Sequence, residues 1–200
     1  MTSSHPKSPW ILARSAQAAV ATAAVVDVFR AVAVRDHYLH RTDATLHRSG
    51  LISMVFVYLM TLTVALFLVW LARSRRTAQE LSPGAPLPSP GWTIGAWFIP
   101  LVNLVVPRGI VLAVGRAGSV SWEERRDTTL VNLWWAAWVT HALVLVITNR
   151  VAPGSVVLLV VAEVLMIAAA ALLGLVIQRI TALQHSALGV TVPVAPPAQV

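Results

Sequence analysis

The stretch SPGWTIGAWFIPLVNLVVPRG, residues Ser89–Gly109, is apolar enough for a membrane interior, yet it contains Pro100, Asn103 and Pro107. Proline lacks a backbone N–H and frees the carbonyl four residues before it, so a helix kinks or breaks where proline stands. In hydrocarbon, such freed groups must find partners in neighbouring protein or in water. The stretch therefore predicts a proline-broken segment that packs against a bundle of helices. Asn103 lies one helical turn from either proline, so we expect its amide to bond a freed carbonyl.

The composition of the whole chain indicates an integral membrane protein. Of 200 residues, 57% are hydrophobic and only 12% are charged, and the mean hydropathy is +0.73; a soluble globular chain carries roughly 25% charged residues. The apolar residues come in runs of about 20, the length that spans ~30 Å of hydrocarbon. A soluble helical bundle is disfavoured for these reasons. The chain has no cysteine, which excludes disulfides and thiolate metal ligands.

Four apolar runs have the length of a membrane span. We expect an all-α fold, an integral membrane four-helix bundle with a proline-broken interfacial or re-entrant helix beside it. The expected spans are about 11–34, 51–72, 129–148 and 155–178, with the broken helix at 92–118, inside a membrane domain 11–185. A cytoplasmic segment 1–10 precedes this domain, and a disordered Pro-rich tail 186–200 follows it.

The first apolar run has a second interpretation as a cleaved signal peptide. The letters ATAA at its centre resemble a small-residue cleavage site. However, the run continues without a break past Asp27 and Arg30. A retained membrane helix is the favoured interpretation.

Two topologies compete for the segment 92–118. Its apolar part, Trp92–Val106, has 15 residues, which is about 22 Å of helix and less than the thickness of the hydrocarbon core. If the segment crosses the membrane, the chain has five spans; if it dips in and returns, the chain has four. Basic residues gather at the cytoplasmic ends of membrane helices, as Arg73, Arg75 and Arg76 do. The charge bias favours four spans with both termini in the cytoplasm.

Asp27, His141 and Glu163 are ionisable residues that lie deep inside the expected spans. A charged group there costs ~2.5–3.5 kcal/mol on insertion scales, so each needs a reason. With four spans and ~1.5 Å of rise per residue, all three and Tyr58 reach one layer, whereas five spans would separate them. The candidate site is this buried polar layer. The simpler alternatives are an ion pair of Asp27 with Arg30, a neutral hydrogen-bonded histidine, and a glutamate that is protonated or paired across helices.

The chain resembles an uncharacterised family of bacterial membrane proteins in two stretches, RSRRTAQELSPGAPLPSPGWTIGAWFIPLVNLVVPRGIVLAV and the later LWWAAWV. The family is the domain of unknown function numbered four thousand three hundred and twenty-eight. The matching motif, a candidate structural motif, consists of Trp97, Phe98, Pro100, Asn103 and Pro107. Thr77 departs from the asparagine that similar sequences usually have. The resemblance implies a membrane bundle and supplies no known reaction.

The sequence contains no nucleotide-binding loop, nucleophile elbow or zincin helix. We therefore expect no enzyme, no catalytic residue, no cofactor and no metal site; three ligands on three helices without motif spacing are weak support for a metal. The favoured function is a non-catalytic partner-binding or structural membrane module, with Trp134 and Trp135 as candidate partner contacts. The alternative is a component of a small-solute or proton pathway that uses the polar layer. An intramembrane or lipid-modifying enzyme ranks last.

The expected partners are the lipid bilayer and an unknown membrane or cytoplasmic protein, with a homo-oligomer as a further option. The formal charge of +7 comes from basic residues that flank the apolar runs, so no nucleic-acid partner is expected. The expected location is the cell membrane, with several spans. An excess of Arg over Lys, with abundant Ala and Val, suggests a high-GC bacterial genome.

Overall fold

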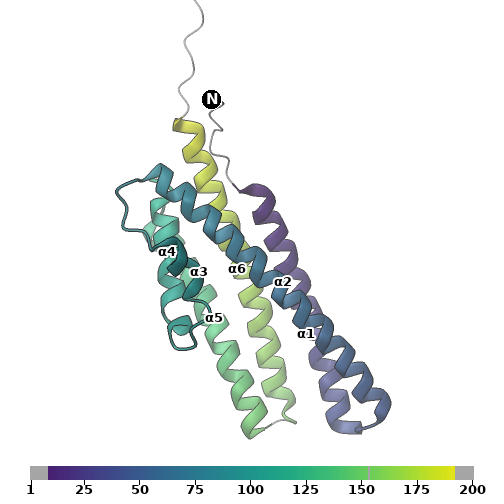
Figure 1. The fold of residues 1–200 in the computed structure, drawn as a ribbon. Coiled ribbons are helices and arrows are strands. Elements are labelled where there is room, and N and C mark those ends of the chain that lie inside the picture. The colour runs from purple at the N-terminus through teal and green to yellow at the C-terminus, as the bar shows by residue number, and fades with distance from the viewer. Residues whose placement is uncertain (1–8, 153, 192–200) are drawn as a thin grey trace, which may run out of the picture.

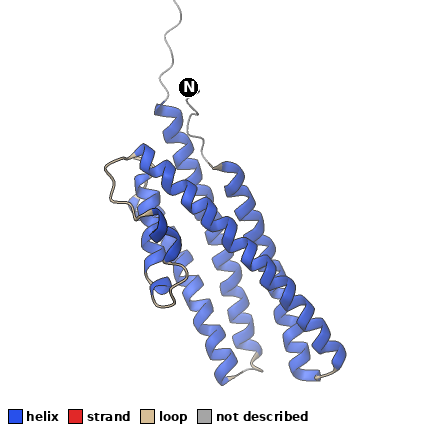
Figure 2. Cartoon of the chain, in the orientation of Figure 1, coloured by secondary structure: helices blue, strands red, loops and turns tan. Residues whose placement is uncertain are grey.

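The computed structural model describes residues 9–152 and 154–191, which form helices joined by short loops (Figures 1 and 2). The elements are α1 (Trp10–His40), α2 (Asp43–Leu81), α3 (Pro90–Gly95), the 3-10 helix η1 (Val102–Leu104), α4 (Val106–Ala117), α5 (Glu124–Val151) and α6 (Val156–Thr191). No strand occurs among these described residues, so the all-α class is confirmed.

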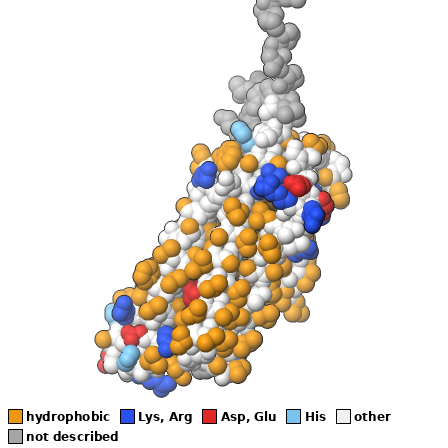
Figure 3. All heavy atoms as spheres, turned by 180° about the vertical axis from the view of Figure 1, so that it is seen from behind, with side chains coloured by type: hydrophobic (Ala, Val, Ile, Leu, Met, Phe, Trp, Pro, Cys, Tyr) orange, Lys and Arg blue, Asp and Glu red, His pale blue; other side chains and the backbone are white. Residues whose placement is uncertain are grey.

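Four of the helices, α1, α2, α5 and α6, are long and apolar enough to cross a membrane. They run antiparallel, with α1 packed along α2, α5 along α6, and α1 also along α6. On the face drawn in Figure 3, hydrophobic side chains cover the middle and most charged side chains gather near the two ends. This distribution is that of a membrane protein, whose apolar middle faces lipid.

The segment between α2 and α5 enters and leaves the bundle at one end, as Figure 1 shows for α3 and α4. At its start, Arg75 on α2 donates from Nε to the carbonyl oxygen of Pro88 at 2.6 Å. At its end, Gly118 lies against the side chain of Gln184 on α6, and Gln184 donates to the Ser74 carbonyl at 2.9 Å. The segment therefore returns to the end of the bundle at which it starts, as the four-span topology predicts, and we call it the re-entrant segment.

The helices extend beyond the apolar runs that predict them. Helix α2 begins at Asp43, eight residues before the expected span, because a capping box at Thr42 and Thr45 satisfies its first backbone groups. Helix α6 continues to Thr191, so the expected disorder is wrong for residues 186–191. The physical reason is that the first helix-breaking residue of this tail is Pro193. Residues 1–8 and 192–200, which hold most of the expected N-terminal segment and tail, lie outside the described residues.

The core lies toward the end of the bundle where the re-entrant segment packs. Trp70 of α2 is fully buried there and donates from Nε1 to the hydroxyl of Thr181 on α6 at 3.0 Å. Asp127, in the first turn of α5, is also buried and accepts two hydrogen bonds from Arg179 on α6, at 2.9 and 3.1 Å. These polar contacts fix the register of α2 and α5 on α6.

Candidate functional site

The first part of the candidate site is an ion pair on α1. Asp27 is 1% exposed and accepts a hydrogen bond from Nε of Arg30 at 2.6 Å. The guanidinium of Arg30 also lies 4.7 Å from the ring centroid of Phe56 on α2. The simpler interpretation of Asp27 is thus the one that the structure adopts, since a buried carboxylate is stable when a cation and hydrogen bonds satisfy it.

Glu163 joins this pair from α6. Its carboxylate is close enough to Asp27 and Arg30 to interact electrostatically with both, but its Oε2 atom is buried without a hydrogen-bond partner. The sequence prediction that Asp27 and Glu163 converge is therefore correct. We also expected that Glu163 is protonated or paired across helices, and among the described residues no hydrogen bond from another helix reaches its Oε2 atom.

His141 of α5 lies next to this group and is already hydrogen-bonded. Its Nδ1 atom is 2.9 Å from the carbonyl oxygen of Ala162, and because a carbonyl only accepts, Nδ1 carries the hydrogen. The ring packs 6.3 Å from that of Trp138. His141 therefore connects α5 to α6 as a hydrogen-bonded side chain.

Tyr58 does not belong to the polar layer, contrary to the sequence prediction. Its side chain is 70% exposed on the outer face of α2. The neighbouring Phe56 faces Arg30 on α1, and two residues correspond to about 200° of rotation in an α-helix. The prediction used only the depth of Tyr58 in the membrane. The rotation of α2 about its axis, which depth does not determine, turns Tyr58 away from the bundle.

A cavity of about 280 Å³ lies between α1, α5 and α6 and is lined by both Arg30 and Glu163. Its other polar lining residues, Arg35, Tyr38, Thr148, Asn149 and Ser155, belong to the end of the bundle that lies opposite the re-entrant segment. In the other direction, the buried side chains of α6 are apolar for four turns: Met166, Ala169, Val176 and Ile177. The polar lining of the cavity therefore continues toward one end of the bundle only. Among the described residues, no three His, Asp or Glu side chains are placed to hold a metal ion.

The second part of the candidate site is the re-entrant segment with its motif residues. Pro107 lies in the first turn of α4, as does Pro90 in α3, where a missing N–H costs nothing. Pro100 lies in the turn between them. The prolines therefore divide the segment into two short helices that form a hairpin, which is the predicted broken helix in detail.

Aromatic side chains hold the hairpin against α2 and α5. The ring of Trp97 lies 5.0 Å from Phe67 and 6.2 Å from Trp135, and Trp134 lies 5.4 Å from Trp135. Trp134 and Trp135 are only 3% and 7% exposed. Their predicted role as partner contacts is therefore wrong, because the chain's own re-entrant segment covers them.

Asn103 also differs from its prediction. We expected its amide to bond a carbonyl freed by proline, but its side chain makes no hydrogen bond in the described structure and its Oδ1 is buried without a partner. Instead, Nε1 of Trp135 donates to the carbonyl oxygen of Leu104 at 3.3 Å, and Nε1 of Trp97 donates to that of Thr93 at 3.1 Å. Asn103 lines an apolar cavity of about 170 Å³ beneath the hairpin.

The sequence prediction missed the residues at the turn of the hairpin. We name this surface the apolar tip; it consists of the exposed side chains of Phe98, Ile99, Leu101, Leu104 and Val105. Leu101 is 81% exposed and Val105 is 72% exposed. The signal was present in the letters FIPLVNLVV, where apolar side chains continue through the break in the backbone.

The family model described as "Domain of unknown function (DUF4328)" matches residues 30–182. The matched range contains the hairpin, the aromatic residues around it, His141 and Glu163, and it begins after Asp27. No curated protein and no solved structure matches the chain.

Proposed function

We propose that this chain, which belongs to the DUF4328 family of unknown function, is a non-catalytic, multi-pass protein of the cell membrane. Its apolar tip binds the membrane helices of a partner protein. The partner is another membrane protein or a second copy of this chain. The observation that carries the proposal is the exposure of the tip at a depth where the backbone is irregular.

The depth of the tip follows from the contacts of α5. Leu104 accepts its hydrogen bond from Trp135, which lies eight residues after the buried Asp127, or ~12 Å further along the helix. Phe67, which packs on the hairpin, lies six residues before Arg73, or ~9 Å from that charge. Both estimates put the tip inside the hydrocarbon of one leaflet.

The backbone at this depth is not helical. The backbone N–H groups of Phe98, Asn103 and Val105 donate to the carbonyl oxygens of Gly95, Ile99 and Val102, respectively. These hydrogen bonds belong to turns and to a single 3-10 turn. Irregular backbone at membrane depth is tolerated where protein or a water-filled cavity covers it, and not where lipid does. The side chains around it are apolar and do not favour water. Protein from a partner is the cover that fits this chemistry.

The polar groups inside the spans support a non-catalytic function. Asp27 is paired with Arg30, and His141 is bonded to a backbone carbonyl. A general base or nucleophile needs a side chain that is free to reach substrate and a second group that activates it. Asp27 is engaged within α1, and His141 is engaged in holding α5 to α6.

A photo-crosslinking amino acid at Leu101 tests the proposal in cells. Its matched control is Val157, which is 71% exposed near the start of α6, at the end of the bundle opposite α3 and α4. We expect a discrete adduct from position 101 and none from position 157; an adduct of twice the chain's mass that persists in the purified protein identifies a second copy. Absence of an adduct at 101, or the same adducts from both positions, contradicts the proposal.

A small-solute or proton-pathway component is the second candidate function. It is favoured by the cavity that reaches Arg30 and Glu163. It ranks second because the buried side chains of α6 are apolar for four turns beyond Glu163. Reconstituted liposomes test it. A pathway requires pH-dependent flux that Glu163→Gln abolishes, whereas a partner-binding module carries no flux in either form.

A further inference from the structure

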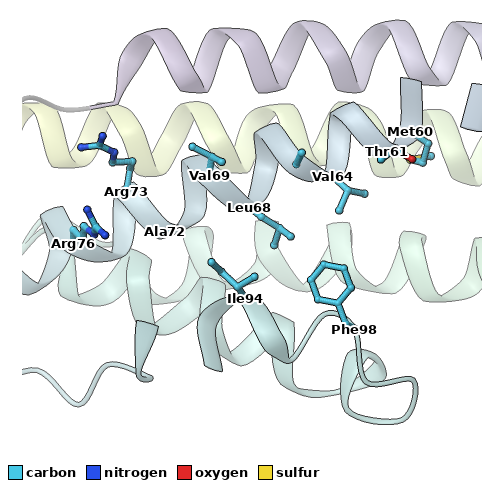
Figure 4. A pocket seen from close by; sticks show the side chains of 11 residues that line it. Met60, Thr61, Val64, Leu68, Val69, Ala72, Arg73, Arg76, Ile94 and Phe98 are labelled. Atoms are coloured by element: carbon cyan, nitrogen blue, oxygen red, sulfur yellow. The ribbon is translucent and has the colours of Figure 1, made fainter. Parts of the chain in front are cut away.

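We propose that the groove between α2 and the re-entrant segment is a binding site for an anionic phospholipid. The phosphate lies between Arg73 and Arg76, and one acyl chain extends along the groove toward Met60 (Figure 4). The site goes beyond the partner-binding proposal and does not depend on it: of the apolar tip only Phe98 lines the groove, and neither Leu101 nor Val105 does.

The groove has the shape and the lining that an acyl chain requires. Its volume is about 780 Å³, and small side chains at Ala65 and Ala72 leave room along α2. Figure 4 shows Ile94 and Phe98 of the re-entrant segment on the side opposite Leu68 and Val64 of α2, with the two arginines at one end and Met60 and Thr61 at the other. The hairpin thus supplies the second wall of a channel whose first wall is α2.

The charge at one end of the groove is unpaired. Arg73 and Arg76 are exposed, and within the described residues neither makes an ion pair or a side-chain hydrogen bond. Arg75, between them in sequence, is engaged with the Pro88 carbonyl. Residues three apart on a helix are neighbours, and like charges there repel each other. A phosphate relieves that repulsion, and the planar guanidinium suits bidentate binding of phosphate oxygens.

The length of the groove matches one leaflet. Arg73 follows directly on the apolar run 51–72, so it marks a membrane–water interface. From there to Met60 is 13 residues, or ~20 Å of helix. One leaflet, measured with its headgroup region, is about half of the ~40–45 Å bilayer. A soluble anion would use the arginines and leave the apolar groove empty, whereas a phospholipid fills both. Anionic lipids are enriched in the cytoplasmic leaflet, the side to which the charge bias assigns these arginines.

Native mass spectrometry of the full chain in detergent tests the charged end. Phosphatidylglycerol and phosphatidylcholine with identical acyl chains are added to the chain and to Arg73→Gln/Arg76→Gln. The control is Arg125→Gln/Arg126→Gln, an exposed arginine pair near the same end of the bundle and off the groove. We expect the chain and the control to prefer phosphatidylglycerol and the groove variant to bind it about tenfold more weakly. No preference in the chain, or an equal loss in both variants, overturns the proposal.

A second pair of variants tests the apolar part of the groove. Ala65→Trp fills it, and Ala171→Trp adds the same side chain to an exposed position on α6. We expect Ala65→Trp to lose at least half of the bound phosphatidylglycerol, and Ala171→Trp to retain it. Melting curves verify that both variants fold. Full retention by Ala65→Trp puts the lipid elsewhere and overturns the proposal, even if the arginine variant fails to fold.

Discussion

Trp135 on α5 donates its indole N–H to the carbonyl oxygen of Leu104, 3.3 Å away in the turn of the re-entrant segment. The indole suits this position because it combines a large apolar body with one hydrogen-bond donor. It packs on Trp97 and satisfies a backbone carbonyl in the same contact. The residues that the sequence offered as a binding surface thus keep an irregular segment inside an apolar environment.

Replacement of Trp135 by Phe tests this contact. The ring remains and the donor is lost, so the free energy of unfolding in detergent should fall by ~1 kcal/mol, the cost typical of a lost buried hydrogen bond. Trp138→Phe is the matched control, because the indole N–H of Trp138 makes no hydrogen bond within the described residues. Equal melting temperatures for the two variants would show that the bond to Leu104 contributes nothing to stability.

Replacement of Asn103 by Leu should leave the melting temperature unchanged or raise it, because Oδ1 of Asn103 is buried without a partner and leucine removes that cost. The control is Asn132→Leu on α5. Oδ1 of Asn132 accepts a hydrogen bond from Nε of Arg108 at 2.7 Å, and its loss should destabilise the protein by ~1 kcal/mol. A clear loss of stability in Asn103→Leu would revive the role that the sequence suggested for this amide.

These two asparagines illustrate what the sequence can and cannot predict. Four spans, the proline break and the return of the segment follow from run lengths, prolines and charge bias, because these depend only on position along the chain. The hydrogen-bond partner of an amide side chain depends instead on the rotation of each helix and on which other donors lie close to the same carbonyl. Trp135, 31 residues away in sequence, donates to the carbonyl oxygen of Leu104. No local sequence pattern predicts that contact.

The polar layer shows the same division. The convergence of Asp27 and Glu163 follows from their common depth in the membrane. Tyr58 reaches the same depth and still points outward, because depth carries no information about rotation. Asp127 was hidden for a different reason: it lies in the charged stretch WEERRD, and only packing against Arg179 distinguishes it from its solvated neighbours.

Asp127→Asn should destabilise the protein by ~1.5–3 kcal/mol, because it weakens a bidentate bond between a buried carboxylate and Arg179. Its matched control is Glu124→Gln, which breaks the exposed pair of Arg116 and Glu124 three residues away. Exposed ion pairs contribute little, so the control should melt like the original chain. Equal losses in the two variants would mean that the buried pair contributes no more than a surface pair.

We expect substitutions of Asp27 and of Glu163, the two acidic residues inside the spans, to differ in their effect on stability. Asp27→Asn should cost about 3 kcal/mol in unfolding free energy, because it leaves the Arg30 guanidinium without its buried counter-ion. Glu163→Gln and Glu163→Leu should both be tolerated, since Oε2 of Glu163 has no hydrogen-bond partner among the described residues and its carboxyl group lies near that of Asp27. Thermal unfolding in detergent measures all three. A loss in Glu163→Leu that Glu163→Gln does not share would reveal a partner for this carboxylate.

Accessibility of single cysteines tests the topology. The chain has no cysteine of its own, so each introduced thiol reports one position. Val120 is fully exposed after the re-entrant segment, Gly84 lies before it, and Ala44 lies at the opposite end of the bundle. We expect an impermeant thiol reagent to label Ala44→Cys in intact cells, and to label Val120→Cys and Gly84→Cys only after the membrane is opened.

The pattern of labelling separates three arrangements because the positions lie on both sides of the segment. A segment that crosses the membrane would put Val120 and Gly84 on opposite sides. The re-entrant hairpin would therefore be contradicted if the reagent labelled Val120→Cys and Ala44→Cys in intact cells but did not label Gly84→Cys. Labelling of Val120→Cys and Gly84→Cys but not Ala44→Cys would retain the hairpin and reverse the bundle. That outcome would also remove Arg73 and Arg76 from the leaflet in which anionic lipids are enriched, since the positive-inside bias would then fail for this chain.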